Sequence, residues 1–181
     1  GMKEVELKKG FPEHYKWVGP SGASVEAGED YPLDLSPFME RKKVLMTCGT
    51  QLAWAKENLI YQATQLAKAH PDCHFFVTRG VGGESFQCEN LMENLSVVSY
   101  LPYKEYIPQM DYVIHHGGAG IFYQCIIYGK PALILPHDYD QFDYAVRGVE
   151  AGVAFSAKRD NSKAIGQAFE ELLAKENWPE L

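Results

Sequence analysis

The sequence predicts a single α/β domain: a Rossmann-like, doubly wound parallel sheet of about six strands. From Lys43 onward, short apolar runs alternate with amphipathic stretches, which is the order produced by right-handed β-α-β crossovers. The apolar runs are nearly continuous, as in a sheet that helices cover on both faces. The length of 181 residues is that of about one domain.

The predicted strands are short runs rich in β-branched and aromatic residues. They are residues 44–47, 75–78, 97–100, 112–115, 132–135 and 153–155. Ligands of such sheets bind outside the carboxyl ends of the strands. The loops that we therefore expect to line the site begin at Gly49, Arg79, Leu101, His116 and Pro136.

The predicted helices follow the apolar spacing of an amphipathic helix. In residues 57–69, Leu59, Ala63 and Leu66 recur at helical spacing, and the pair His70-Pro71 ends the helix. The other helices are expected at residues 120–128, 141–151 and 162–175.

Residues 1–42 differ from the rest of the chain. They hold four prolines and five glycines and show no sustained period, which predicts an extended arm or interdomain linker. Residues 43–181 then form the folded domain.

Composition excludes several classes of protein. The net charge of −7 argues against a general nucleic-acid binder, which neutralises phosphates with basic residues, but not against a small anion held by backbone amides. No apolar run is long enough for a transmembrane segment, and the charged start lacks the apolar centre of a secretory signal. The four cysteines have no regular spacing and read as reduced thiols, so we expect a cytoplasmic protein. A zinc site could be drawn from His70, Cys73, His74 and Cys88, but their spacing matches no recognised zinc motif.

The most informative segment is residues 114–124, Ile-His-His-Gly-Gly-Ala-Gly-Ile-Phe-Tyr-Gln. An apolar strand leads into two histidines and three glycines, and a helix follows. The glycines let a ligand approach the backbone, and the helix start offers free N–H groups and partial positive charge. These features suit a phosphate, to which His116 could donate a further hydrogen bond. The alternative is a tight strand-to-helix turn with two ordinary histidines.

This segment is neither a dinucleotide fingerprint nor a Walker loop. The first strand ends with a single glycine, Gly49, where the dinucleotide motif needs three. The pair Gly129-Lys130 is followed by Pro131 and lacks the earlier glycine of a Walker loop. The absence of these two motifs argues against NAD binding and against ATP hydrolysis.

The segment resembles the C-terminal, donor-binding half of family 1 glycosyltransferases of the two-domain GT-B type, especially the bacterial antibiotic and sterol glucosyltransferases. Four blocks match in order: residues 44–50, 100–108, 115–120 and 131–141. The resemblance covers about Lys43 to Ala174, and residues 17–20 are similar to the end of the acceptor half.

The resemblance implies a role for each matching position. The diphosphate would face Gly49, Thr50, His116, Gly118, Ala119 and Gly120. Tyr100 would lie against the base, and the Leu101 backbone would contact the edge of the base. Gln124 stands where the ribose is often bound, and Asp140 and Gln141 would bind hydroxyls of the transferred sugar.

The sequence also departs from the family pattern. Ile121 replaces a Ser or Thr, Gln124 a Glu, Tyr103 a Gln and Tyr144 an Asn. The pair Asp138 and Asp140 sits in the sugar-facing block, so we expect no metal there.

The resemblance implies a domain that binds a UDP-sugar and requires no cofactor. In this family the general base lies on the acceptor half, so the catalytic residues are unknown here. We expect transfer to a small-molecule or lipid acceptor only with a missing N-terminal acceptor domain or a partner subunit, and no transfer by this chain alone. The alternative is a non-catalytic nucleotide-binding or interaction module. A sugar-nucleotide epimerase is disfavoured by the Asp140-Gln141 block.

Overall fold

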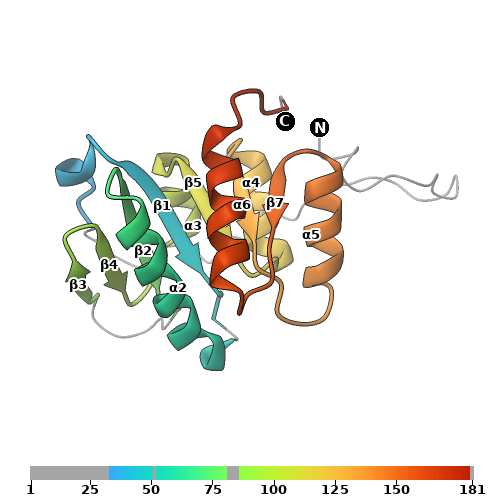
Figure 1. The fold of residues 1–181 in the computed structure, drawn as a ribbon. Coiled ribbons are helices and arrows are strands. Elements are labelled where there is room, and N and C mark those ends of the chain that lie inside the picture. Colours follow the sequence, from blue (N-terminus) through green and yellow to red (C-terminus); the bar gives the residue numbers. More distant parts are fainter. Residues whose placement is uncertain (1–32, 51, 81–85, 180–181) are drawn as a thin grey trace, which may run out of the picture.

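A computed structural model describes residues 33–50, 52–80 and 86–179 (Figure 1). One seven-stranded sheet runs in the order β3-β4-β2-β1-β5-β6-β7. Every neighbouring pair is parallel except β3 with β4. The strands are β1 Lys42–Thr47, β2 Cys73–Thr78, β3 Cys88–Met92, β4 Leu95–Val98, β5 Tyr112–His115, β6 Ala132–Ile134 and β7 Ala154–Ser156. The predicted α/β fold is confirmed.

Helices cover both faces of the sheet. Figure 1 shows α2 (Lys56–Ala69) and α6 (Ser162–Ala174) in front of the sheet, and α3 (Tyr103–Tyr106) and α4 (Ala119–Ile127) behind it. Helix α5 (Gln141–Glu150) packs on the same face as α4. In the part of the chain that the structure describes, no helix has both the length and the apolar character needed to cross a bilayer.

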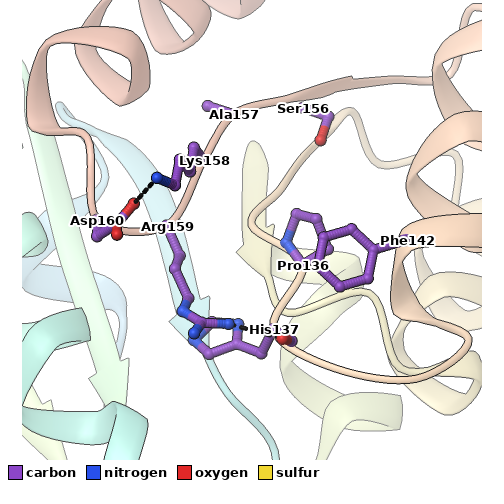
Figure 2. Close-up of a pocket in the computed structure, with 8 residues that line it drawn as sticks. All are labelled: Pro136, His137, Phe142, Ser156, Ala157, Lys158, Arg159 and Asp160. Carbon is purple, nitrogen blue, oxygen red and sulfur yellow. Dashed lines mark hydrogen bonds and ion pairs between the residues drawn. The ribbon is translucent and has the colours of Figure 1, made fainter.

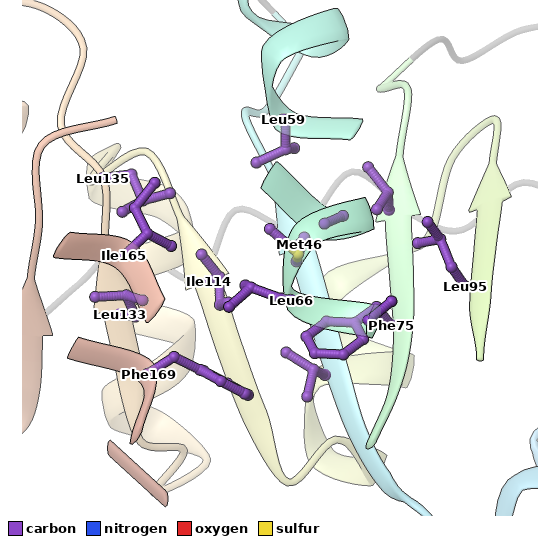
Figure 3. Close-up of a cluster of buried hydrophobic side chains, with 14 of the residues drawn as sticks. Met46, Leu59, Leu66, Phe75, Leu95, Ile114, Leu133, Leu135, Ile165 and Phe169 are labelled. Atoms are coloured by element: carbon purple, nitrogen blue, oxygen red, sulfur yellow. The ribbon is translucent and has the colours of Figure 1, made fainter. Parts of the chain in front are cut away.

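Two apolar clusters, one on each face, hold the helices to the sheet. Along β1, Val44 and Met46 enter the cluster under α2 and α6, whereas Leu45 enters the cluster under α3 and α4. All three are fully buried. Figure 3 shows the first cluster, where Phe169 of α6 lies over the strands. Burial on both faces explains why the strands read as continuous apolar runs.

The sequence prediction missed β3 and placed β4 two residues too late. β3 is an exposed edge strand with the sequence Cys-Glu-Asn-Leu-Met, so it carries no apolar pattern. Backbone pairing with β4 forms it instead, across the turn at Glu93 and Asn94. The Asn94 side chain, 6% exposed, donates hydrogen bonds to the carbonyls of Ala67, His70 and Cys73 and so secures the turn.

The end of the predicted arm packs on the domain. Leu35 is buried in the cluster under α3 and α4, and the short 3-10 helix η1 (Ser36–Phe38) follows it. Two further 3-10 helices are η2 (Ala53–Ala55) and η3 (Ile107–Gln109). Residues 1–32, including the segment 17–20, lie outside the described residues, so the arm and its boundary stay predictions.

Replacing Phe169 with alanine should lower the free energy of unfolding by about 3–5 kcal/mol, because it leaves a cavity at the centre of the first cluster. The Phe169 ring lies 5.0 Å from the ring of His70 and 5.7 Å from that of Phe75, between centroids. Guanidinium unfolding measures the change. Glu170→Ala, at the neighbouring exposed position of α6, is the control and should change stability by less than about 0.5 kcal/mol. Equal losses in the two variants would contradict this packing.

Candidate functional site

The loops that the sequence singled out meet at one edge of the sheet. Strands β1, β5 and β6 are parallel neighbours, so the loops after them lie side by side at their carboxyl ends. The loop after β4 lies at the same edge, two strands from β1. The fold therefore brings together the predicted diphosphate, base and sugar positions.

The glycine loop after β5 needs glycine at two positions. Gly117 has φ +91°, and a Cβ there would lie 2.9 Å from the backbone oxygen of Gln141. A Cβ on Gly118 would lie 2.5 Å from Nε2 of His116. Gly118 is the N-cap of α4, and no side chain caps this helix end. The amides at the start of α4, in the turn that holds Ala119 and Gly120, lack intrahelical partners and can bind an anion.

The His116 ring is wedged between the loops after β1 and β5. A Cβ on Gly49 would lie 3.0 Å from Cε1 of His116. The ring therefore fits between Gly49 and Gly118 because neither residue has a Cβ. Burial, and then the neighbouring His137, lower the pKa of His116 to about 4. At pH 7 His116 is thus a neutral imidazole and adds no positive charge to the loop.

His115 organises the loop, although it was not among the predicted contact residues. Its Nδ1 accepts a hydrogen bond from the amide of Gly117 at 3.0 Å, so Nε2 carries the proton of the neutral ring. That Nε2 is buried without a hydrogen-bond partner. Burial lowers the pKa of His115 to about 3. The residue that shapes the glycine loop is therefore the first of the two adjacent histidines.

Backbone contact holds the loop after β1. Gly49 has φ +68°, and its amide donates to Oγ1 of Thr47 at 3.0 Å. Thr50 is exposed at the mouth. Gly80 follows β2 with φ +64°, and a Cβ there would lie 2.3 Å from the oxygen of Gly49. Only glycine allows these two loops to approach so closely.

The loop after β4 presents backbone rather than side chains. The Leu101 side chain is fully buried in the second cluster, whereas Tyr100 is partly exposed. Tyr103 points away from the loop: its hydroxyl lies 2.9 Å from Oγ1 of Thr47, and burial raises its pKa to about 12. Tyr103 thus braces the end of β1.

The loop after β6 carries the predicted sugar-binding pair. Asp140 is exposed at the N-cap of α5. Gln141 is 7% exposed, and its Oε1 accepts hydrogen bonds from the amides of His137 at 2.9 Å and Asp138 at 3.1 Å. Tyr139, which lies between Asp138 and Asp140, has φ +53° and is 91% exposed. The oxygen of Gln141 is therefore occupied, and its –NH₂ group is the end of the amide that remains for a ligand.

Helices α4 and α5 hold three of the four positions where the sequence departs from the family pattern; the fourth is Tyr103 of α3. Ile121 is 2% exposed and belongs to the second cluster, so it fills the core. The Tyr144 ring packs on Phe122, with centroids 5.1 Å apart. Gln124, the predicted ribose position, has a buried Oε1 without a hydrogen-bond partner.

A pocket lies beside the loop after β6 (Figure 2). Its volume is about 480 Å³. Its lining comes from the loops after β6 and β7 and the start of α5: Pro136, His137, Phe142, Ser156, Ala157, Lys158, Arg159 and Asp160. Sequence reasoning did not single out Arg159, because a lone arginine after a short strand has no distinguishing pattern.

The structure offers no metal site among the residues it describes. The residues of the zinc grouping face different ways: Cys73 belongs to the first cluster, whereas the His74 ring packs on Phe38 with centroids 4.0 Å apart and its Nε2 lies 2.8 Å from Oγ of Ser96. Arg79, at the end of β2, forms an exposed ion pair with Glu89 at 3.4 Å.

Comparison with known proteins agrees with this geometry. Residues 81–180 match the family model described as the C-terminal domain of proteins like erythromycin biosynthesis protein CIII. The uncharacterized UDP-glucosyltransferase YdhE of Bacillus subtilis (strain 168) is 25% identical over 93% of this chain and 42% of its own length. The sterol 3-beta-glucosyltransferase of Komagataella phaffii is 33% identical over 90% of this chain and 14% of its own.

A solved structure shows the same fold. The crystal structure of the glycosyltransferase SnogD from Streptomyces nogalater superposes with a TM-score of 0.64 at 25% identity, over 94% of this chain and 44% of that one. The chain therefore spans well under half the length of the relatives it matches.

Replacing Gly80 with alanine should lower the free energy of unfolding by about 2 kcal/mol or more. The new Cβ would overlap the backbone of Gly49, and the left-handed conformation penalises any side chain. Gly166→Ala in α6 is the control: nothing lies within 4 Å of its Cβ, so alanine should raise stability by about 0.5–1 kcal/mol. If urea unfolding shows an unchanged free energy of unfolding for Gly80→Ala, the close approach of these two loops is contradicted.

Stability should fall as the pH falls from 7 to 5, because four of the six histidines have lowered pKa values: His74, His115, His116 and His137. The unfolded chain binds protons near pH 6.5, whereas His74, His115 and His116 in the folded chain do not bind them until about pH 4 or below. The free energy of unfolding should drop by more than about 1.4 kcal/mol per pH unit, the limit for one group. Denaturant titrations at several pH values measure the slope. His116→Asn should make it shallower, and an unchanged slope would show that His116 titrates normally.

Proposed function

Since the chain belongs to the family of C-terminal domains like that of erythromycin biosynthesis protein CIII, a C-terminal domain of GT-B glycosyltransferases, we propose that it binds a nucleotide sugar as the donor half of such an enzyme. The donor we propose is a UDP-sugar, and UDP-glucose is the first choice because the relative YdhE carries the name uncharacterized UDP-glucosyltransferase.

The single observation that carries this proposal is the open glycine loop at the N-terminus of α4. Gly120 has nothing within 4 Å of the position its Cβ would take, so the first turn of the helix is bare toward the loop edge. We assign the diphosphate to this turn and to the backbone at Gly118 and Ala119. His116 and the backbone at Gly49 and Thr50 border the same site. Backbone amides and the helix dipole supply the attraction, which explains how a chain of charge −7 can hold an anion.

The two ends of the donor would lie on either side of the diphosphate. On the side of the loop after β4, we assign the base to the Tyr100 ring and the Leu101 backbone. The unpartnered Oε1 of Gln124 is the acceptor offered to a ribose hydroxyl. On the side of the loop after β6, the carboxylate of Asp140 and the –NH₂ group of Gln141 are a matched acceptor and donor for neighbouring sugar hydroxyls.

In the transfer reaction this domain would stabilise the leaving group. As the bond between the sugar and the diphosphate breaks, negative charge grows on the diphosphate oxygens, where the amides of the α4 turn already point. Among the residues that the structure describes we assign no general base, and the chain spans about 40% of the length of YdhE and of SnogD. We therefore propose that the acceptor site and the base come from an N-terminal domain or a partner, and that the chain alone transfers no sugar.

Gly120→Glu should abolish nucleotide binding without harming the fold. The side chain has free space, and a carboxylate at a helix start favours the helix, yet it would repel the diphosphate. Gly120→Gln has nearly the same size without the charge and is the matched control. Calorimetric titration with UDP should show affinity at least about tenfold lower for the Glu variant than for the Gln variant. Equal affinities would place the diphosphate elsewhere.

A panel of ligands separates this function from the alternative module. Thermal unfolding should be followed with UDP, UDP-glucose, TDP, TDP-glucose, ATP and NAD. A nucleotide sugar at about 100 times its Kd should stabilise the chain by about 2.7 kcal/mol. Stabilisation by the UDP or TDP pair supports the donor domain and identifies the base. No response to any nucleotide supports a non-catalytic interaction module and overturns the proposal.

A further inference from the structure

Three side chains that were not predicted as site residues tie two loops of the predicted site to the loop after β7. Trp54 follows β1 in η2, His137 follows β6, and Arg159 follows β7. The ring centroids of Trp54 and His137 are 5.6 Å apart, and Cζ of Arg159 lies 5.0 Å from the Trp54 centroid. Figure 2 shows the Arg159 side chain reaching along the pocket wall to the backbone of His137.

Arg159 holds the carbonyl of His137. Its Nη1 donates to the His137 oxygen at 2.6 Å, a charge-assisted hydrogen bond. The amide of the same residue donates to Oε1 of Gln141 at 2.9 Å. His137 is 5% exposed, so loss of the arginine would leave its carbonyl short of both a protein partner and ready access to water. The backbone of the loop that carries Asp140 is thus fixed from two sides.

Arg159 is itself held in place. Its guanidinium stacks over Trp54, and its own carbonyl accepts a hydrogen bond from Nδ2 of Asn58 at 3.0 Å. Among the described residues no carboxylate forms an ion pair with it, whereas its neighbour Lys158 pairs with Asp160 at 3.6 Å. The guanidinium of Arg159 therefore interacts with the His137 carbonyl and with the Trp54 indole, and its planar shape allows both contacts at once.

We propose that Arg159 is a positioning residue for the transferred sugar. It holds the His137 peptide so that the segment from Asp138 to Gln141 presents the carboxylate of Asp140 and the –NH₂ group of Gln141 to the sugar hydroxyls. Arg159 acts through the loop and not by contact with the donor. This inference rests on the proposed donor-binding function, and it predicts a loss confined to the sugar end of the ligand.

The test compares UDP-glucose with UDP, by calorimetric titration of the whole chain. For Arg159→Ala, the affinity for UDP-glucose should fall at least about tenfold, whereas the affinity for UDP should change less than about threefold. Arg159→Lys keeps the charge and one donor and should recover at least half of the loss on a logarithmic scale. Lys158→Ala removes a charge of the same sign from the same pocket wall. The Lys158 side chain is 77% exposed, so its loss should change the affinity for neither ligand.

The outcomes separate this inference from the function beneath it. If the wild-type chain binds neither ligand, the donor-binding function fails and the inference falls with it. If the wild-type chain binds both but Arg159→Ala weakens them equally, or weakens neither, the function stands and the inference is overturned. Circular dichroism checks that each variant folds. If Arg159→Ala does not fold, Arg159→Lys must show a larger loss of affinity for UDP-glucose than for UDP. Equal losses for the two ligands would overturn the inference.

Discussion

Parallel pairing of β1, β5 and β6 is the constraint on which the candidate site depends. It sends the carboxyl ends of these strands to one edge, so segments that are 24 to 91 residues apart in sequence must meet there: Gly49, His116 and Asp140. Parallel pairing also demands crossovers, and here they lie on both faces, which is why the two apolar clusters exist and why the strand interiors are mainly apolar. His74 of β2 and Ser96 of β4 are exceptions, and they contact each other. The polar chemistry is left to the loops.

At that edge the loops are packed by backbone contact. Gly80 meets Gly49, and Gly117 meets the backbone of Gln141, at separations that a Cβ would violate. Side chains hold two amides of these glycines inward, because the Gly49 amide donates to Thr47 and the Gly117 amide donates to His115. Desolvation keeps the buried His115 and His116 neutral, so under the proposed function the loop would bind the anion through oriented dipoles rather than a fixed positive charge.

Much of this could be predicted from residue patterns. Helices α2 and α6 begin or end within a residue of the predicted bounds, because their apolar spacing and their stop and cap residues are local signals. The glycine run after β5 could be identified for the same reason. Strand β3 could not, since an exposed edge strand is held by pairing with β4 and needs no apolar face. Departures from the family pattern were also ambiguous in sequence: Ile121 and Tyr103 turn out to point into the protein, where they pack.

By itself the sequence determined the α/β class, the sites of the strand-to-helix turns and the candidate anion loop, because periodicity and glycine conformation are properties of neighbouring residues. Only the tertiary structure decided that the oxygen of Gln141 is already bonded to the loop backbone, that His115 shapes the glycine loop, and that Arg159 reaches the carbonyl of His137. The contact of Arg159 with His137 joins the loops after two different strands, so its partner is set by the order of the strands in the sheet, which no local pattern encodes. The bonds of His115 and Gln141 join residues of one loop, but they depend on the backbone conformation that each loop adopts when it packs against its neighbours.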